Sequence, residues 1–181
     1  MSLRISFELS NNDIKHFREA MRKARRTVRM REDSEIVSEA RPLFEDVDTR
    51  QVPVFVRHRI ELLKAMTDML EDEEWHMRRR ERERVLTALA YFRDPDDLIP
   101  DEIPGLGFLD DAIMIELAVR ELKHEIEAYR DFCSYREKYD SGFRLRRNAD
   151  TRARKLAARE QQLRERAARR RDKEQGPAQV L

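Results

Sequence analysis

Apolar residues recur at intervals of three and four along most of this chain, and charged residues fill the positions between them. That spacing places the apolar side chains on one face of an α-helix, so the core has to be assembled from narrow helical stripes. Charged residues make up 41% of the chain and only four residues are glycine, which disfavours an all-β fold with its many tight turns. We therefore predict an all-α helical bundle.

The stripes also predict where the helices lie. They indicate helices over residues 14–28, from 34 to a proline at 42 that ends or kinks the helix, over 53–72 with a break near Asp72, over 74–93, and over 110–139. The first half of the last helix is apolar nearly all round, which indicates a helix packed on more than one side. We interpret the arginine- and glutamate-rich run at 78–84 as a solvated helix face.

The two ends of the chain differ from this pattern. Residues 3–9 alternate between apolar and polar types, which predicts one short N-terminal strand or an extended arm. Residues 144–173 hold 13 Lys or Arg and 4 Asp or Glu, so a basic, partly helical or disordered tail follows an acidic body. We predict three parts, namely 1–52 with the arm and two helices, a helical domain at 53–140, and the tail at 141–181.

A turn-forming segment at residues 94–111 separates two of the predicted helices. Three of the six prolines and two of the four glycines of the chain fall within it. Proline disfavours helical geometry at the residue before it, so this segment is predicted to be a rigid connection rather than a continuing helix. Its aspartates stand where helices begin, a position that the helix dipole favours for negative charge.

The same segment resembles the signature of the YkvA family. The resemblance rests on Tyr91, Phe92, Pro95, Asp97, Pro100, Asp101, Pro104, Gly107, Asp110 and Asp111. It implies a bacterial helical domain of unknown function, completed by flanking helices from about 54 to 136. Asp96 and Glu102 stand where many members have apolar residues, and the chain lacks the hydrophobic spans of some members. Both departures indicate a soluble branch.

Two sets of residues could bind a metal ion. Asp97, Asp101, Asp110 and Asp111 could converge on Mg²⁺ or Ca²⁺, although such aspartates can equally cap helices and solvate a turn. The second set consists of two Glu-x-x-His pairs, Glu73 with His76 and Glu121 with His124, the spacing that di-iron helical bundles use. Chance pairs are expected in a chain so rich in glutamate, so structural readings stand beside both hypotheses.

The basic tail could bind an anionic polymer or surface. Its candidate residues are Arg144, Arg146, Arg147, Arg152, Arg154, Lys155, Arg169, Arg170 and Arg171. They could contact nucleic acid or an anionic membrane surface through phosphate groups. However, residues 144–173 contain no aromatic side chain to stack on bases, and a solubilising extension explains the same composition.

The chain shows no familiar catalytic motif. It has no Gly-x-Ser-x-Gly elbow, phosphate loop or dinucleotide fingerprint, and its one cysteine, Cys133, has no evident activating neighbour. The lone cysteine and the lack of an apolar leader or transmembrane segment predict a cytoplasmic protein, which could be peripheral to the membrane. We favour a non-enzymatic scaffold or adaptor with a protein partner or as a homo-oligomer, over a metal-dependent enzyme or an anionic-surface binder.

Overall fold

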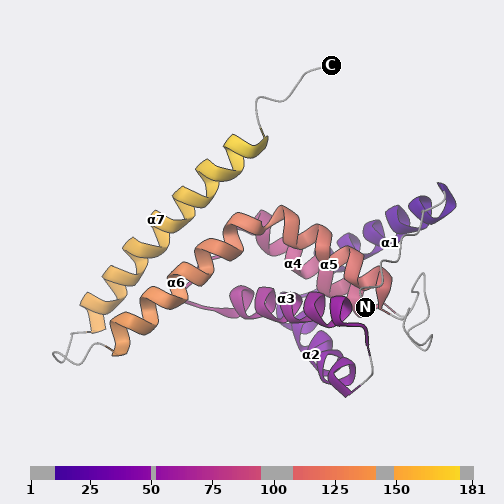
Figure 1. Ribbon diagram of the computed structural model, residues 1–181, viewed down its shortest axis with the longest axis horizontal. Coiled ribbons are helices and arrows are strands. Elements are labelled where there is room, and N and C mark those ends of the chain that lie inside the picture. The colour runs from indigo at the N-terminus through magenta and orange to yellow at the C-terminus, as the bar shows by residue number, and fades with distance from the viewer. Residues whose placement is uncertain (1–10, 50–51, 95–107, 142–148, 176–181) are drawn as a thin grey trace, which may run out of the picture.

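The computed structural model describes residues 11–49, 52–94, 108–141 and 149–175, which contain seven α-helices (Figure 1). They are α1 (Asn11–Met30), α2 (Asp33–Thr49), α3 (Val54–Glu71), α4 (Arg79–Phe92), α5 (Leu109–Glu121), α6 (Lys123–Ser141) and α7 (Ala149–Gln175). The predicted all-α fold is thus confirmed. The predicted N-terminal strand or arm falls on residues 1–10 and lies outside the described residues.

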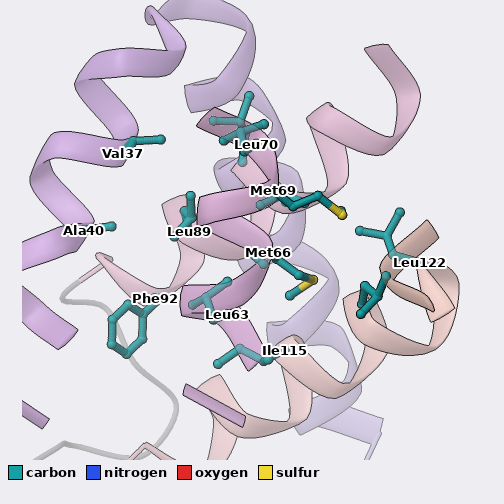
Figure 2. Close-up of a cluster of buried hydrophobic side chains, with 14 of the residues drawn as sticks. Val37, Ala40, Leu63, Met66, Met69, Leu70, Leu89, Phe92, Ile115 and Leu122 are labelled. Carbon is teal, nitrogen blue, oxygen red and sulfur yellow. The ribbon is translucent and has the colours of Figure 1, made fainter. Parts of the chain in front are cut away.

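Helix α4 lies at the centre of the bundle. It packs against α1, α2, α3 and α5, and every residue from Val85 to Phe92 is buried. Figure 2 shows part of this core, in which Leu63 and Met66 of α3 lie near Leu89 of α4 and Ile115 of α5. Each large apolar side chain that is fully buried contributes roughly 1.5 to 3 kcal/mol to folding. None of the described helices combines the length and the hydropathy needed to cross a bilayer.

Proline 42 does not end its helix. α2 continues through Pro42 to Thr49, with Phe44 and Val47 buried beyond the proline. A proline inside a helix costs about 3 kcal/mol, and burial of the two apolar side chains that follow offsets a cost of that size. Of the two predicted outcomes, an end of the helix at Pro42 is wrong, because tertiary packing outweighs the local penalty, and a kink there stays a prediction.

The helix predicted at 110–139 is two helices. Leu122 departs from helical geometry (φ −104°, ψ 9°) and separates α5 from α6, although its amide still donates to the carbonyl of Ala118 at 3.0 Å. No proline or glycine is present at this position. The break lets α5 pack against α3 and α4 while α6 runs beside α7. Leu122 is itself fully buried, so packing decides where the helix breaks.

The start of α5 requires an unusual backbone at Phe108. This residue adopts the left-handed conformation (φ 63°, ψ 14°), which costs a residue with a side chain roughly 1 to 2 kcal/mol. Its ring is buried and packs against Phe92, with the two ring centroids 6.4 Å apart. The aromatic contact between the end of α4 and the start of α5 offsets the backbone cost.

The break predicted near Asp72 is confirmed, because α3 ends at Glu71. The next helix, however, begins at Arg79 and not at residue 74. The residues between α3 and α4 carry Trp75, whose side chain is buried against Tyr129 and Phe132 of α6. Insertion of this indole holds the connection in a non-helical path.

Helix α7 runs antiparallel to α6 (Figure 1). Near one end Arg152 of α7 pairs with Asp140 of α6, and near the other Arg170 pairs with Glu127. Leu156, Leu163 and Ala167 of α7 are buried, whereas Ala153 is exposed. The second part of the tail is thus an ordered helix that packs on the body, and the proposed division of the chain at residue 140 stays a prediction.

Candidate functional site

The described residues at and beside the two ends of the turn-forming segment pack into the bundle. Tyr91 and Phe92 are buried at the end of α4, and Asp110 and Asp111 are buried in the first turn of α5. The hydroxyl of Tyr91 donates to Oδ2 of Asp110 at 3.3 Å. Asp94 accepts a hydrogen bond from Nζ of Lys23 on α1 at 2.8 Å. These contacts tie together the helices on both sides of the segment.

The remaining signature residues, Pro95, Asp97, Pro100, Asp101, Pro104 and Gly107, lie outside the described residues. The aspartate metal site therefore stays a prediction, since only Asp110 and Asp111 of its four carboxylates can be placed. Both belong to a helix start, where the dipole stabilises negative charge.

The two Glu-x-x-His pairs have separate surroundings. Glu73 and His76 lie in the connection between α3 and α4, where His76 is 73% exposed and its Nδ1 is 3.4 Å from Oε2 of Glu160. Glu121, at the end of α5, pairs with Arg84 at 2.6 Å. The imidazole of His124 is buried on α6, with Nε2 3.0 Å from Oε2 of Glu174. Within the described part of the chain, no group of three His, Cys, Asp or Glu side chains is arranged to hold a metal ion.

Two carboxylates clamp the α3–α4 connection onto α6 and α7. Asp72 accepts hydrogen bonds from the hydroxyl of Tyr129 at 3.0 Å and from Nη1 of Arg136 at 2.9 Å. Glu74 pairs with Arg136 at 3.0 Å and also with Arg152 of α7. The hydrogen bond from Arg152 is the main cause that lowers the pKa of Glu74 below its usual range. This acidic connection therefore has a structural role.

Three further carboxylates are buried where α7 packs on the body, namely Glu81 of α4, Glu125 of α6 and Glu160 of α7. Nη1 of Arg171 lies 2.6 Å from Oε1 of Glu125 and 3.4 Å from Oε1 of Glu81. Arg164 pairs with Glu160 at 2.8 Å, and its Nη2 is 3.8 Å from Glu81. Glu81 also accepts a hydrogen bond from the backbone amide of Arg78 at 3.2 Å and so caps α4.

This network corrects the interpretation of residues 78–84 as a solvated face. Glu81 is buried, and Arg82 and Arg84 are half-buried. The sequence pattern of alternating charge at helical spacing describes one helix by itself. It contains no information about α7, whose Arg164 and Arg171 compensate the buried charge of Glu81. Nor does it show that Arg82 pairs with Asp33 of α2 or Arg84 with Glu121 of α5.

We predict that Glu125→Gln raises the melting temperature at neutral pH by a few degrees. Burial, together with the nearby carboxylate of Glu81, raises the pKa of Glu125 above its usual range despite Arg171. The carboxyl of Glu125 therefore binds its proton more tightly in the folded protein than in the unfolded chain. The ionised carboxylate lowers the stability of the fold by its full amount above the raised pKa, and this loss of stability disappears as pH falls below the pKa of the unfolded chain. Thermal melts of the wild type and of Glu125→Gln across a pH series measure the difference in melting temperature. We expect this difference to disappear in acid.

Glu74→Gln is the matched comparison, with the opposite sign. Because the pKa of Glu74 is lowered, its ionised form stabilises the protein above the unfolded pKa, and this stability is lost as pH falls through the folded pKa. The glutamine variant should melt lower than the wild type at neutral pH and approach it in acid. Identical pH profiles for the two variants would contradict this assignment of the two carboxyls.

Most of the described tail residues already have partners. Arg152, Arg170 and Arg171 pair with carboxylates of the body, Nζ of Lys155 lies 5.7 Å from the ring centroid of Tyr139, and Arg169 is 3.7 Å from Glu165. Arg154 is exposed without a partner among the described residues. Arg144, Arg146 and Arg147 lie outside them. Anion binding by the tail stays a prediction, and it would have to compete with these internal pairs.

A groove of about 380 Å³ opens between α1, α4 and α5. Its apolar lining combines Met21 of α1, Ala88 of α4, and Met114, Leu117 and Ala118 of α5. Leu117 is 49% exposed, although most of the apolar residues around it in the sequence are buried or half-buried. An exposed leucine among methionines and alanines is a surface to which another apolar side chain can bind.

Arginine dominates the polar rim of this groove. The charged residues that line it are Arg25 and Arg29 of α1, Arg80, Glu83 and Arg84 of α4, and Glu121 of α5. Arg84 pairs with Glu121 at 2.6 Å, and Arg29 is 3.9 Å from Glu83. Neither Arg25 nor Arg80 forms an ion pair with any residue in the ranges that the structure describes. The groove therefore has an excess of positive charge beside an exposed apolar surface.

Neither this groove nor the buried network was predicted from the amino-acid sequence. Two signals were present for the groove: Arg25 and Arg29, and likewise Arg80 and Arg84, stand one helical turn apart. The spacing of arginines on one helix does not show whether a neighbouring helix leaves a groove beside them. In the sequence, these two pairs therefore could not be distinguished from arginines on an ordinary solvated face.

Comparison with known families gives one match. Residues 84–117 match a family model described as "Protein of unknown function (DUF1232)", which supports an uncharacterised domain family over this segment without confirming the YkvA name. No curated protein and no solved structure matches the chain. The matched segment includes Arg84, Ala88, Met114 and Leu117, so it contributes to two of the three helices around the groove. Over residues 84–117, which take in most of α4 and most of α5, this chain is similar to a family whose function is unknown.

Proposed function

We propose that this protein is a non-enzymatic scaffold or adaptor that receives a partner protein in the groove between α1, α4 and α5. The observation that carries this proposal is the exposed Leu117 beside arginines that the described chain leaves uncompensated. Arginine and methionine are enriched at protein interfaces, and apolar contacts surrounded by a polar rim are typical of them. A groove of this composition suits a protein surface better than a small polar substrate.

The two alternative functions have less support. Arg152, Arg170 and Arg171 of the tail already compensate acidic groups of the body, which leaves less positive charge for nucleic acid or an anionic membrane surface. For the metal-dependent alternative, the two Glu-x-x-His pairs have separate surroundings, since His76 is largely exposed and Glu121 pairs with Arg84. Metal binding by the aspartates of the turn stays a prediction, because Asp97 and Asp101 lie outside the described residues. A cytoplasmic location is part of the proposal and rests on the lone Cys133.

Site-specific photo-cross-linking in the cell that makes the protein tests the adaptor role. With p-benzoylphenylalanine in place of Leu117, we expect irradiation to yield a discrete adduct with another protein. A product of twice the chain mass would instead indicate a homo-oligomer. The control places the same group at Val54, which is 84% exposed on α3 and does not line the groove. If both positions give only free protein, or the same set of adducts, the groove is not an interaction site.

A further inference from the structure

We infer that the groove between α1, α4 and α5 binds an acidic amphipathic helix of a partner protein. This inference rests on the proposed adaptor function and adds the chemistry of the partner. It follows from three features of the groove, namely the spacing of its arginines, the place of its exposed leucine, and the charges that remain after its internal ion pairs are counted.

The arginines form two rows with helical spacing. Arg25 and Arg29 stand four residues apart on α1, and Arg80 and Arg84 stand four residues apart on α4. Positions four residues apart on a helix lie about 6 Å apart along its axis. Because α1 packs directly against α4, the two rows lie on neighbouring helices. One arginine of each row, Arg25 on α1 and Arg80 on α4, has no ion pair among the described residues, so a partner helix would direct its carboxylates to both rows.

The apolar lining lies on the side of the groove that α5 provides. Met114, Leu117 and Ala118 follow one another at helical spacing, and Leu117 is the exposed member. A partner helix with an apolar stripe could bury this leucine while its acidic flank faces α1 and α4. Met21 is unbranched, flexible and half-buried, so it can adapt to side chains of different shape, whereas Met114 is buried.

The internal ion pairs determine which charge the partner must carry. Glu121 already compensates Arg84, and Glu83 lies near Arg29, so the partner's carboxylates are needed at Arg25 and Arg80. A basic helix would place its cations against these two arginines, and like charges in contact oppose binding. The groove therefore selects acidic over basic amphipathic helices.

Fluorescence anisotropy with two synthetic helical peptides tests the inference on the full-length protein. Both peptides carry the same leucine stripe, which is flanked by glutamates in one and by lysines in the other. We expect the glutamate peptide to bind, with affinity that falls as salt rises, and the lysine peptide to bind at least about tenfold more weakly. Equal binding of the two peptides, or no binding of the glutamate peptide, would overturn the inference.

Paired variants connect this binding to the groove. Arg25→Glu combined with Arg80→Glu should weaken binding of the glutamate peptide by about tenfold or more. The control is Arg130→Glu combined with Arg154→Glu, which makes the same change in net charge at exposed positions of α6 and α7. Leu117→Ser should also weaken binding, whereas Val54→Ser should leave it unchanged. Similar losses in the groove variants and their controls would count against the site.

Other occupants give distinguishable results. If the protein floats with phosphatidylglycerol vesicles, loses this property in the Arg25→Glu, Arg80→Glu variant, and does not bind the peptide, the groove binds a lipid surface instead. A dimer in analytical ultracentrifugation that Leu117→Ser dissociates would show that a second copy fills the groove. Either result overturns the acidic-helix inference. If the Leu117 cross-link captures a partner but no acidic peptide binds, the adaptor proposal stands and only the partner chemistry is wrong.

Discussion

Replacing Phe132 with alanine is expected to lower the free energy of unfolding by about 3 to 5 kcal/mol. The side chain is 0% exposed, its ring centroid is 5.4 Å from that of Trp75, and the guanidinium of Arg136 lies 5.3 Å from it. Truncation leaves a cavity where α6 meets the α3–α4 connection, and neighbouring backbone can collapse into it only in part. Chemical unfolding in urea measures the loss directly.

Two further substitutions serve as controls for the loss of stability expected in Phe132→Ala. Phe55→Ala removes the same side chain from a position at the start of α3 that is 44% exposed, and it should change stability by no more than about 0.5 kcal/mol. Phe132→Leu keeps much of the apolar volume and should fall between the two. If Phe132→Ala proves as mild as Phe55→Ala, α6 does not pack on Trp75 in the way described.

Arg171→Met is expected to destabilise the protein by about 2 to 4 kcal/mol. The change removes the closest cation to Glu125 and one of the two arginines near Glu81, leaving carboxylates buried between α4, α6 and α7. Losing one partner of a buried pair costs about 3 to 5 kcal/mol, and we expect somewhat less here because Arg171 is partly exposed. Unfolding midpoints in guanidinium chloride or by heat give the value.

A double-mutant cycle separates lost charge compensation from lost packing. Adding Glu125→Gln to Arg171→Met removes the uncompensated charge and should recover a large part of the stability. Arg170→Met is the matched control, because its partner Glu127 is exposed and such surface pairs contribute about 0 to 1 kcal/mol. If Glu125→Gln rescues nothing, the effect of Arg171 comes from its aliphatic part and not from its charge.

The sequence predicted the elements of this fold better than their joints. Apolar residues at helical spacing predicted a helix over the span of α1, and the span of α3 with its end near Asp72, because each depends on one helix having a face to bury. For the tail the sequence left open whether the chain is partly helical or disordered. The break at Leu122 and the continuation of α2 through Pro42 depend on neighbouring helices, which local propensity does not include. The left-handed backbone of Phe108 has the same origin, since the contact with Phe92 makes it tolerable.

The functional residues were harder to predict, although one signal was overlooked. On α7, Glu160, Arg164 and Arg171 share a helical face with the buried Leu163 and so are placed to face the body. Charges within an apolar stripe predict buried ion pairs with another element. The sequence could not predict which carboxylates pair with the arginines of α7. Glu81 and Glu125 are distant from α7 in sequence, and nothing in their local sequence distinguishes them from solvated glutamates.

The position of α7 has a practical consequence for how this protein is handled. Its arginines act as built-in counterions for the acidic face of the body, so a chain shortened before Ala149 would present Glu74, Glu81 and Glu125 without them. Such a fragment would attract arginine-rich helices that imitate α7. Basic proteins recovered with the shortened chain, but not with the full-length one, would therefore be substitutes for its own missing helix and not physiological partners.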